Sequence, residues 1–282
     1  MKVGIIGGSG LYKIDGLKDV TEIKVDTPFG DPSDKYIAGR LEGVDIVFLP
    51  RHSRGHTIMP TELNYRANIY GMKKLGVEQI ISISAVGSFK KELKPLDIVL
   101  PDQFVDRTNQ ARKTTFFGEG IVAHISFAEP VCADLRNIIY GAGKLMGLTI
   151  HDKGTYLNME GPAFSTKAES LLYKSWGMDI IGMTNMAEAR LAREAEICFA
   201  TVAFITDYDC WHEEIVTIDM VIENLTKNVE TAKNLIKKTV PLLARKRKCQ
   251  CKDALKYAIV TNKKLIPDTI KEKLDIIIGK YM

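Results

Sequence analysis

One stretch decides how the chain folds: Ile197-Cys198-Phe199-Ala200-Thr201-Val202-Ala203-Phe204-Ile205-Thr206-Asp207-Tyr208-Asp209-Cys210-Trp211. Its first nine residues form an apolar run of strand length, typical of a strand buried on both faces in the middle of an α/β sheet. Asp207 and Asp209 follow directly, and ligands of such sheets bind outside the carboxyl ends of the strands. An isolated Asp-x-Asp more often shapes a turn, so this pair gains weight only from other motifs in the chain.

The composition is that of an ordinary globular protein. The 282 residues are 45% hydrophobic and 26% charged, which is enough for a full core. The net charge of +4 is concentrated in Arg245-Lys246-Arg247-Lys248, which we interpret as a solvated helix end. No apolar stretch approaches the ~20 residues that span a bilayer. We therefore predict no nucleic-acid or membrane partner.

The five cysteines indicate the compartment. Their number is odd and most have apolar neighbours, as in reduced thiols of cytosolic enzymes. The amino terminus has no signal-peptide layout, so we expect a cytoplasmic protein. Cys249 and Cys251 are read as two free thiols, with a labile disulfide as the alternative, because a bridge across one residue would be strained. Two ligands alone do not make a metal site, and we predict none.

Hydrophobic periodicity and turn residues predict alternating strands and helices. We expect strands near residues 3–6, 21–25, 35–38, 44–49, 79–85, 97–100, 179–183 and 197–207, with 148–158 extended. Helices are expected over 61–75, 131–146, 165–176, 187–194 and 218–244, followed by two short helical stretches. These elements predict one α/β domain spanning residues 1–282. Its mixed central β-sheet is surrounded by helices, with a helical carboxyl-terminal portion from about residue 217.

The first motif is a strand that runs into a glycine-rich turn, Val3-Gly4-Ile5-Ile6-Gly7-Gly8-Ser9-Gly10-Leu11. Successive backbone amides in such a turn form an anion-binding nest, to which Ser9 adds a hydroxyl donor. A dinucleotide-dependent oxidoreductase is the competing interpretation. Its third glycine is missing, because Lys13 stands at that position, and there is no Walker lysine. The loop suits a smaller anion.

The second motif is Leu49-Pro50-Arg51-His52-Ser53-Arg54-Gly55-His56-Thr57. The planar guanidinium of Arg51 suits an oxyanion held by two hydrogen bonds. His52 and His56 have a spacing found in metal sites, but no carboxylate lies between them and two arginines would repel a cation. This segment favours an anion site.

Three further strand ends carry polar or aromatic residues. Ser84 and Ala85 lie near the end of a buried strand. Glu160 could hold ribose hydroxyls, and Phe164 could stack on a flat ligand, although a buried Phe is usually core. The last of the three is Ile181-Gly182-Met183-Thr184-Asn185-Met186-Ala187-Glu188.

Together these segments resemble the trimeric purine-nucleoside phosphorylases, in the family's order from residue 4 to 211. One departure is Asn185-Met186-Ala187, where many members carry Thr-Val-Pro, and it lies beside the expected ligand residues. The shared motifs are Gly7-Gly8-Ser9-Gly10-Leu11, Arg51-His52, His56-Thr57-Ile58-Met59-Pro60, Met159-Glu160-Gly161-Pro162, Gly182-Met183-Thr184 and Thr206-Asp207-Tyr208-Asp209-Cys210-Trp211.

The resemblance implies a homotrimer, no cofactor, and a role for each matching residue. Phosphate would be held by Ser9, Arg51, His52, Ser84, Ala85 and Thr184. The purine would face Asp207 and Asp209, and the nucleoside would contact Phe164, Ser165, Met183 and Glu160. The 5'-substituent would meet Ile218 of the same chain and His124 of a neighbouring subunit.

The residue types fit phosphorolysis of an N-glycosidic bond, in which negative charge develops on the departing purine. A carboxylic acid at Asp207, its pKa raised by burial, could protonate that purine. A carboxylate at Asp209 accepts from a 6-amino group but repels a 6-carbonyl. We therefore expect phosphorolysis of 5'-methylthioadenosine. The alternatives are a phosphorylase of inosine, guanosine or methylthioinosine, and a non-catalytic nucleoside-binding protein.

Overall fold

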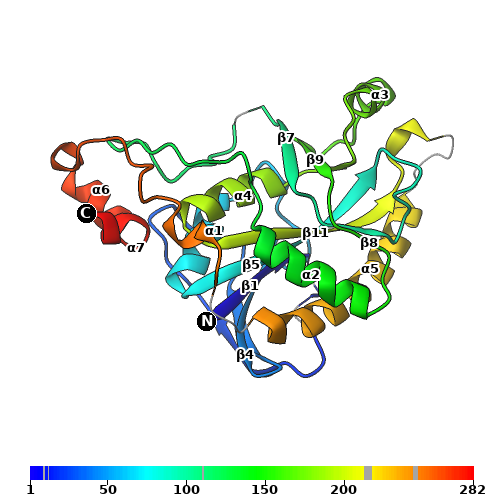
Figure 1. Ribbon diagram of the computed structural model, residues 1–282, viewed down its shortest axis with the longest axis horizontal. Coiled ribbons are helices and arrows are strands. Elements are labelled where there is room, and N and C mark those ends of the chain that lie inside the picture. Colours follow the sequence, from blue (N-terminus) through cyan, green and yellow to red (C-terminus); the bar gives the residue numbers. More distant parts are fainter. Residues whose placement is uncertain (9, 12, 110, 213–217, 244–246) are drawn as a thin grey trace.

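The computed structural model describes residues 1–8, 10–11, 13–109, 111–212, 218–243 and 247–282, without the side chains of 218–221. A mixed sheet lies at its centre with helices packed around it, as predicted (Figure 1). The strands are β1 (Lys2–Gly7), β2 (Lys18–Ile23), β3 (Tyr36–Leu41), β4 (Val44–Pro50), β5 (Val77–Ser88), β6 (Ile98–Val99), β7 (Gln103–Arg107), β8 (Ile150–His151), β9 (Thr155–Met159), β10 (Ile180–Gly182) and β11 (Cys198–Asp207). The α-helices are α1 (Tyr65–Lys74), α2 (Ala133–Leu145), α3 (Lys167–Ser175), α4 (Asn185–Glu194), α5 (Ile218–Leu243), α6 (Asp268–Lys273) and α7 (Asp275–Ile278), and four short 3₁₀ turns are η1 (Asp209–Trp211), η2 (Gln250–Asp253), η3 (Lys263–Leu265) and η4 (Gly279–Tyr281).

Strand β5 organises the sheet. It pairs in parallel with β1 on one side and with β11 on the other, and its last residues pair antiparallel with β10. The main path of the sheet runs β2-β3-β4-β1-β5-β10-β9-β7. Most of β5 is buried by its neighbours, and its second half carries serines, alanine and glycine. The strand therefore continues past the predicted end at residue 85 and delivers small polar residues to one edge of the sheet.

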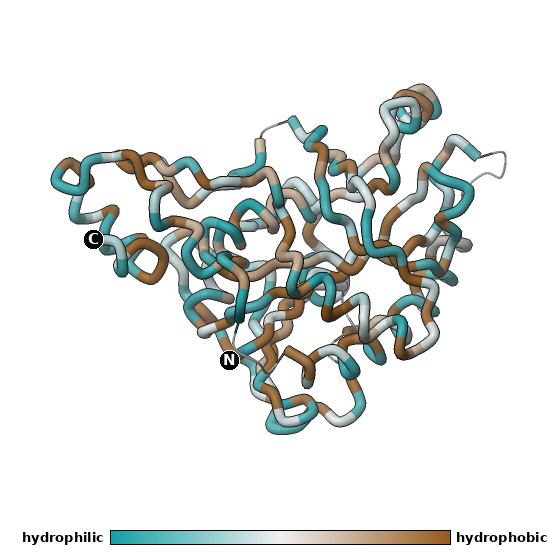
Figure 2. Tube along the Cα trace, in the orientation of Figure 1, coloured by the Kyte–Doolittle hydropathy of each residue, from teal (hydrophilic) through white to brown (hydrophobic). Residues whose placement is uncertain are grey.

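Helices cover both faces of this sheet. On one face α1 and α4 pack together, and their buried side chains form a core that also includes α6 and α7. On the other face α2 and α5 pack against each other and against β11. Figure 2 shows hydrophobic residues along the central strands, and hydrophobic and hydrophilic residues alternating in the helices and loops around them. Among the helices that the structure describes, none combines the length and the apolar character needed to cross a bilayer.

Most element boundaries agree with the sequence, and the differences have local causes. Helix α1 begins at Tyr65 because the side chain of Asn64 caps it, accepting from the amide of Ala67. The predicted capping box of Thr166 and Glu169 is confirmed at α3. Strand β7 was not predicted, since its residues are half-buried and mostly polar.

Candidate functional site

Parallel pairing of β1, β4 and β5 brings three motifs to one edge of the sheet. Gly7 lies opposite Pro50, and Ile6 lies opposite Ser82. The amide of Arg51 then donates to the carbonyl of Gly7 over 2.8 Å. The glycine-rich turn, the arginine and the serines of β5 therefore share one location, as predicted for parallel strands that end together.

Arg51 is buried, with 4% of its surface exposed, and its side chain is already engaged. Nε donates to Oε1 of the buried Glu188 over 2.5 Å, and Nη2 donates to Oε2 of Glu188 and to Ser82 Oγ. Nη1 donates to the carbonyl of Ile83 over 2.9 Å. Four of the five N–H groups of the guanidinium are used in these bonds, and only one N–H of Nη1 has no acceptor among the residues that the structure describes. The predicted grip on an anion by two guanidinium hydrogen bonds is therefore not available in this conformation, and the phosphate role of Arg51 stays a prediction.

His52 lies next to Arg51 in its neutral form. Burial lowers its pKa to about 4, and the charge of Arg51 adds to that effect. Its Nδ1 is 2.8 Å from the carbonyl of Ile58, so Nδ1–H is the donor there, and its ring stacks on His56 with the centroids 4.4 Å apart. Nε2 then keeps a lone pair, which can accept a hydrogen bond from a protonated phosphate oxygen.

Ser84 and Ala85 lie on β5 where the strand reaches the edge. Ser84 is buried, and its Oγ is 3.1 Å from the hydroxyl of Tyr156. Tyr156 occupies the space above Gly182, where a Cβ would come within 1.8 Å of the Tyr156 hydroxyl oxygen. Ala85 is exposed. Small residues here leave room for a ligand beside the strand.

Thr184 stands at the amino end of α4, which points at the same edge. It is the N-cap residue, and its side chain makes no capping hydrogen bond. Asn185 joins it to β5, since Nδ2 lies 3.3 Å from both Thr184 Oγ1 and Ser82 Oγ. Asn185-Met186-Ala187, the tripeptide that differs from the family's usual sequence, forms the first turn of α4. The helix therefore begins two residues earlier than predicted. A helix amino terminus favours a bound anion, which fits the predicted phosphate role of Thr184.

Asp207 and Asp209 are held beside each other. The amide of Asp209 donates to Asp207 Oδ1 over 2.8 Å, and the hydroxyl of Thr206 lies 2.7 Å from Asp207 Oδ2. The pairing of β11 with β5 shifts register between Ile205 and Asp207, so Thr206 is an additional residue there. Gly87 faces the pair, and a Cβ on it would come within 3.0 Å of Asp207 Oδ1.

Burial raises the pKa of both carboxyl groups above the ordinary value of an aspartate. The hydrogen bonds from Thr206 and from the Asp209 amide oppose the shift at Asp207 but are the smaller causes. Thr206 suits either protonation state, because its hydroxyl lies 3.2 Å from the carbonyl of Val86 and can donate there while it accepts from a protonated Asp207. The site can thus hold and release a proton at Asp207.

Helix α3 and the segment before it complete this side. Ser170 of α3 donates to Asp209 Oδ2, and Cys210 Sγ donates to the carbonyl of Ser165 over 3.2 Å. Phe164, 66% exposed, precedes Ser165. The structure therefore places Ser165 beside Cys210, the residue that follows Asp209, and the contacts of Phe164 and Ser165 with a base stay a prediction.

Sequence reasoning missed Arg112, which holds Glu160 and the backbone of Met183 together. Its Nε donates to Glu160 Oε1 over 2.9 Å, and its Nη groups donate to the carbonyls of Glu160 and Met183. The amide of Asn109 donates to Glu160 Oε2. Gly161 allows Met183 to approach, since a Cβ there would lie 2.5 Å from Met183 Sδ. Arg112 is 7% exposed, and only its pairing with a distant glutamate reveals it.

Three predicted residues are not placed with this group. Ser9 and the side chain of Ile218, the first residue of α5, lie outside the described residues. His124 is exposed, and its amide donates to the carbonyl of Ala258 over 2.8 Å. Residues 113–130 run beside α6 and α7, on the opposite side of the molecule from α3 (Figure 1). The segment that carries His124 is therefore held away from α3, whose Ser170 contacts Asp209.

The chain is similar in sequence and in fold to known phosphorylases. The family model described as "Phosphorylase superfamily" matches residues 2–241. The S-methyl-5'-thioadenosine phosphorylases of Geobacter sulfurreducens and Koribacter versatilis are 59% and 56% identical, with 99% of this chain and 99% and 96% of theirs aligned. A crystal structure of a methylthioadenosine phosphorylase from an Antarctic soil metagenomic library superposes with a TM-score of 0.94 at 47% identity, covering 98% of both chains.

Proposed function

The chain belongs to the phosphorylase superfamily, and from that premise we propose that it cleaves S-methyl-5'-thioadenosine with phosphate, giving adenine and 5-methylthioribose 1-phosphate. It is a pentosyltransferase acting on a nucleoside. The observation that carries the proposal is the pair of half-buried Asp207 and buried Asp209, both with raised pKa values, at the sheet edge that also holds Arg51 and the amino end of α4.

The reaction needs positioning and charge rather than a cofactor. A phosphate oxygen forms a bond to the anomeric carbon of the sugar while the bond to the purine nitrogen breaks, and that electron pair leaves with the purine. Protonated Asp207 gives its proton to the departing base and becomes a carboxylate. Thr206 accommodates both states of Asp207, because it can accept from the acid and donate to the carboxylate. No metal or organic cofactor takes part in these steps.

Asp209 would select the base. Ser170 donates to Oδ2, which supports a carboxylate with its other oxygen available to accept from a 6-amino group. A 6-oxopurine would place two acceptors against each other, and discrimination of this kind can reach roughly 10⁴-fold.

The test is the release of adenine or hypoxanthine from methylthioadenosine, adenosine and inosine, each with and without phosphate. We expect release only with phosphate and a strong preference for methylthioadenosine over inosine. Equal turnover in phosphate-free buffer would show that the protein is a hydrolase and not a phosphorylase. Equal cleavage of inosine would remove the selection assigned to Asp209.

The active assembly would be a homotrimer in which His124 of one subunit enters the site of the next. What supports this is the exposure of His124 on a segment that its own chain holds away from α3. Cyclic closure is the usual form for such contacts. Light scattering during the assay should give the mass of three chains, and a fully active monomer would contradict the assembly. A cytoplasmic location stays a prediction from the cysteine content.

A further inference from the structure

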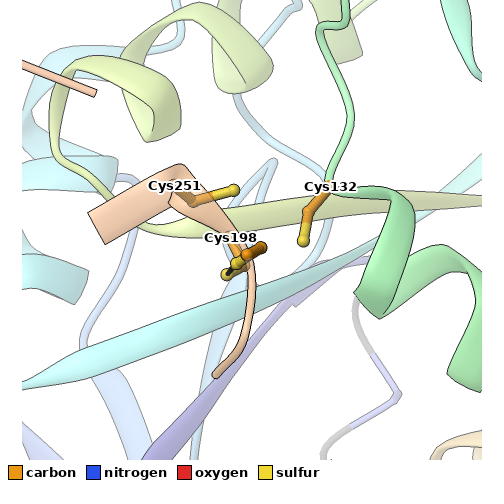
Figure 3. A group of neighbouring side chains, drawn as sticks. Cys132, Cys198 and Cys251 are labelled. Atoms are coloured by element: carbon orange, nitrogen blue, oxygen red, sulfur yellow. Dashed lines mark hydrogen bonds between the residues drawn. The ribbon is translucent and has the colours of Figure 1, made fainter. Parts of the chain in front are cut away.

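Four cysteines lie together at the amino end of β11, far from the proposed site. Cys132 is the N-cap of α2, Cys198 begins β11, and Cys249 and Cys251 flank the first residue of η2. Their four sulfur atoms all lie within 4.8 Å of one another. Figure 3 shows Cys132, Cys198 and Cys251 coming from three separate segments with their sulfurs close together. The sequence alone had offered only Cys249 and Cys251 as a possible pair.

The arrangement matches a tetrahedral thiolate site. Zinc binds thiolates at about 2.3 Å, so four ligands at the corners of a tetrahedron stand about 3.8 Å apart. The closest sulfurs here, Cys198 and Cys249, are 3.2 Å apart, and no pair exceeds 4.8 Å. Changes of about an ångström would complete the geometry. We propose that these four thiols bind one divalent cation of the zinc class.

The surroundings suit the charge that such a site would carry. Each thiol gives its proton to solvent on binding, and four thiolates around a divalent cation leave a net charge of −2. Arg247 offsets part of it, since Nη1 lies 3.8 Å from Cys198 Sγ. Cys132 also stands at the positive amino end of the 13-residue helix α2.

The site is both enclosed and reachable. Cys132 and Cys198 are 4% and 1% exposed and belong to the core between the sheet and helices α2 and α5. A cavity of about 490 Å³ opens beside them, lined also by Cys249, Arg247 and Lys248. A closed shell of four protein ligands is the pattern of a structural metal, and the cavity gives the ion a path of entry.

The cation would hold the chain after α5 onto the sheet. Cys198 and Asp207 lie at opposite ends of one ten-residue strand, roughly 30 Å apart at the usual rise per residue. The metal therefore takes no part in base release. Disulfide bonds between the same sulfurs would instead need an external oxidant, and all five cysteines are free thiols here.

Cobalt(II) titration of the reduced, chelator-stripped full-length protein tests the proposal. We expect one cobalt per chain, with the intense visible bands of tetrahedral coordination and sulfur-to-cobalt charge transfer, and loss of these bands when zinc is added. X-ray absorption of the zinc form should show four sulfur neighbours. Absence of the cobalt spectrum from the reduced wild-type protein would overturn the proposal, and so would thiols already paired as disulfides after anaerobic purification.

Matched variants assign the ligands. Cys132→Ser and Cys251→Ser should each weaken cobalt binding by at least about 100-fold, as expected when a thiolate of a closed site is lost. Cys210→Ser, which changes the fifth cysteine outside the cluster, should bind cobalt like the parent. An unchanged spectrum in Cys132→Ser would contradict the four-cysteine site. The wild-type titration decides the matter even if a ligand variant does not fold.

Discussion

The two ends of β11 collect ionisable groups by different means. At the carboxyl end, Asp207 is held by the hydroxyl of Thr206 and the amide of Asp209, both within two residues of it. At the amino end, Cys198 meets Cys132, Cys249 and Cys251, which lie at least 51 positions away in the chain. The first cluster is built by local hydrogen bonds and the second by tertiary packing.

The two ends also differ in the charge state that their surroundings favour. Burial at the carboxyl end raises the pKa of Asp207, which favours the protonated acid that base release requires, whereas at Asp209 the hydrogen bond from Ser170 opposes the effect of burial and stabilises the carboxylate. A metal at the amino end would favour deprotonated thiolates. Changes at the carboxyl end should therefore affect turnover with little effect on folding, and changes at the amino end should do the reverse.

The largest effect is expected from Asp207→Asn. The amide cannot supply the proton, so kcat for methylthioadenosine should fall roughly 10²–10⁴-fold. Because the folded state raises the pKa of Asp207, this group contributes most to stability below the pKa of the unfolded chain, and that contribution is lost as pH rises. At neutral pH the variant should thus unfold at the same urea concentration as the parent or a higher one. A near-normal kcat in the variant would show that Asp207 is not the acid that protonates the departing base.

The second prediction concerns Arg51, a residue whose replacement should change both turnover and folding stability. Arg51→Ala leaves Glu188 buried without its partner, which should cost about 3–5 kcal/mol of unfolding free energy and raise KM for phosphate. The double variant Arg51→Met with Glu188→Met serves as the control. It should regain much of the stability but not the use of phosphate. Urea unfolding and phosphate titrations measure both effects, and an unaffected KM in the double variant would exclude Arg51 from phosphate binding.

A smaller effect is expected from Asp209→Asn. This variant separates the proposed role of Asp209 in base selection from that of Asp207 in proton donation. Ser170 should hold the amide oxygen as it now holds Oδ2, which turns the amide N–H₂ toward the base. The preference in kcat/KM for methylthioadenosine over inosine should then fall roughly 10²-fold. Ser170→Ala in the same background should weaken that relaxation. An unchanged preference would mean that another residue reads the base.

The smallest effect is expected next to the amino end of β11, at Glu196. This buried carboxylate accepts from the amide of Leu255 over 3.0 Å and pairs with Lys280. Glu196→Gln keeps the first bond and loses the ion pair, whose partner is about half exposed, so the loss should be about 1 kcal/mol of unfolding free energy. Turnover should stay within about twofold of the parent, as expected for a residue outside the site. A large fall in kcat would contradict this prediction and show that the two ends of β11 are coupled.

This contrast explains what the sequence could predict. The strand before Asp207 is an unbroken apolar run, and the residues that hold the aspartates follow it immediately, so both the fold class and the candidate acid were accessible from the chain. The cysteine cluster depends on three segments that meet only after folding. The roles of Arg112 and Glu188 likewise rest on partners 48 and 137 positions away. Strand β7 carries too few apolar residues to be recognised by periodicity.

Gly87 of β5 packs closely against Asp207 and Asp209, which follow much later in the chain. A Cβ at this glycine would lie 3.0 Å from Asp207 Oδ1 and 3.3 Å from the Cβ of Asp209, so even alanine crowds the carboxylates from behind. The aspartates therefore restrict the size of a residue 120 positions earlier in the chain, on the neighbouring strand β5. Alanine at position 87 would require the side chains of Asp207 and Asp209 to shift by a few tenths of an ångström, so replacing this glycine would move the groups proposed to release the base.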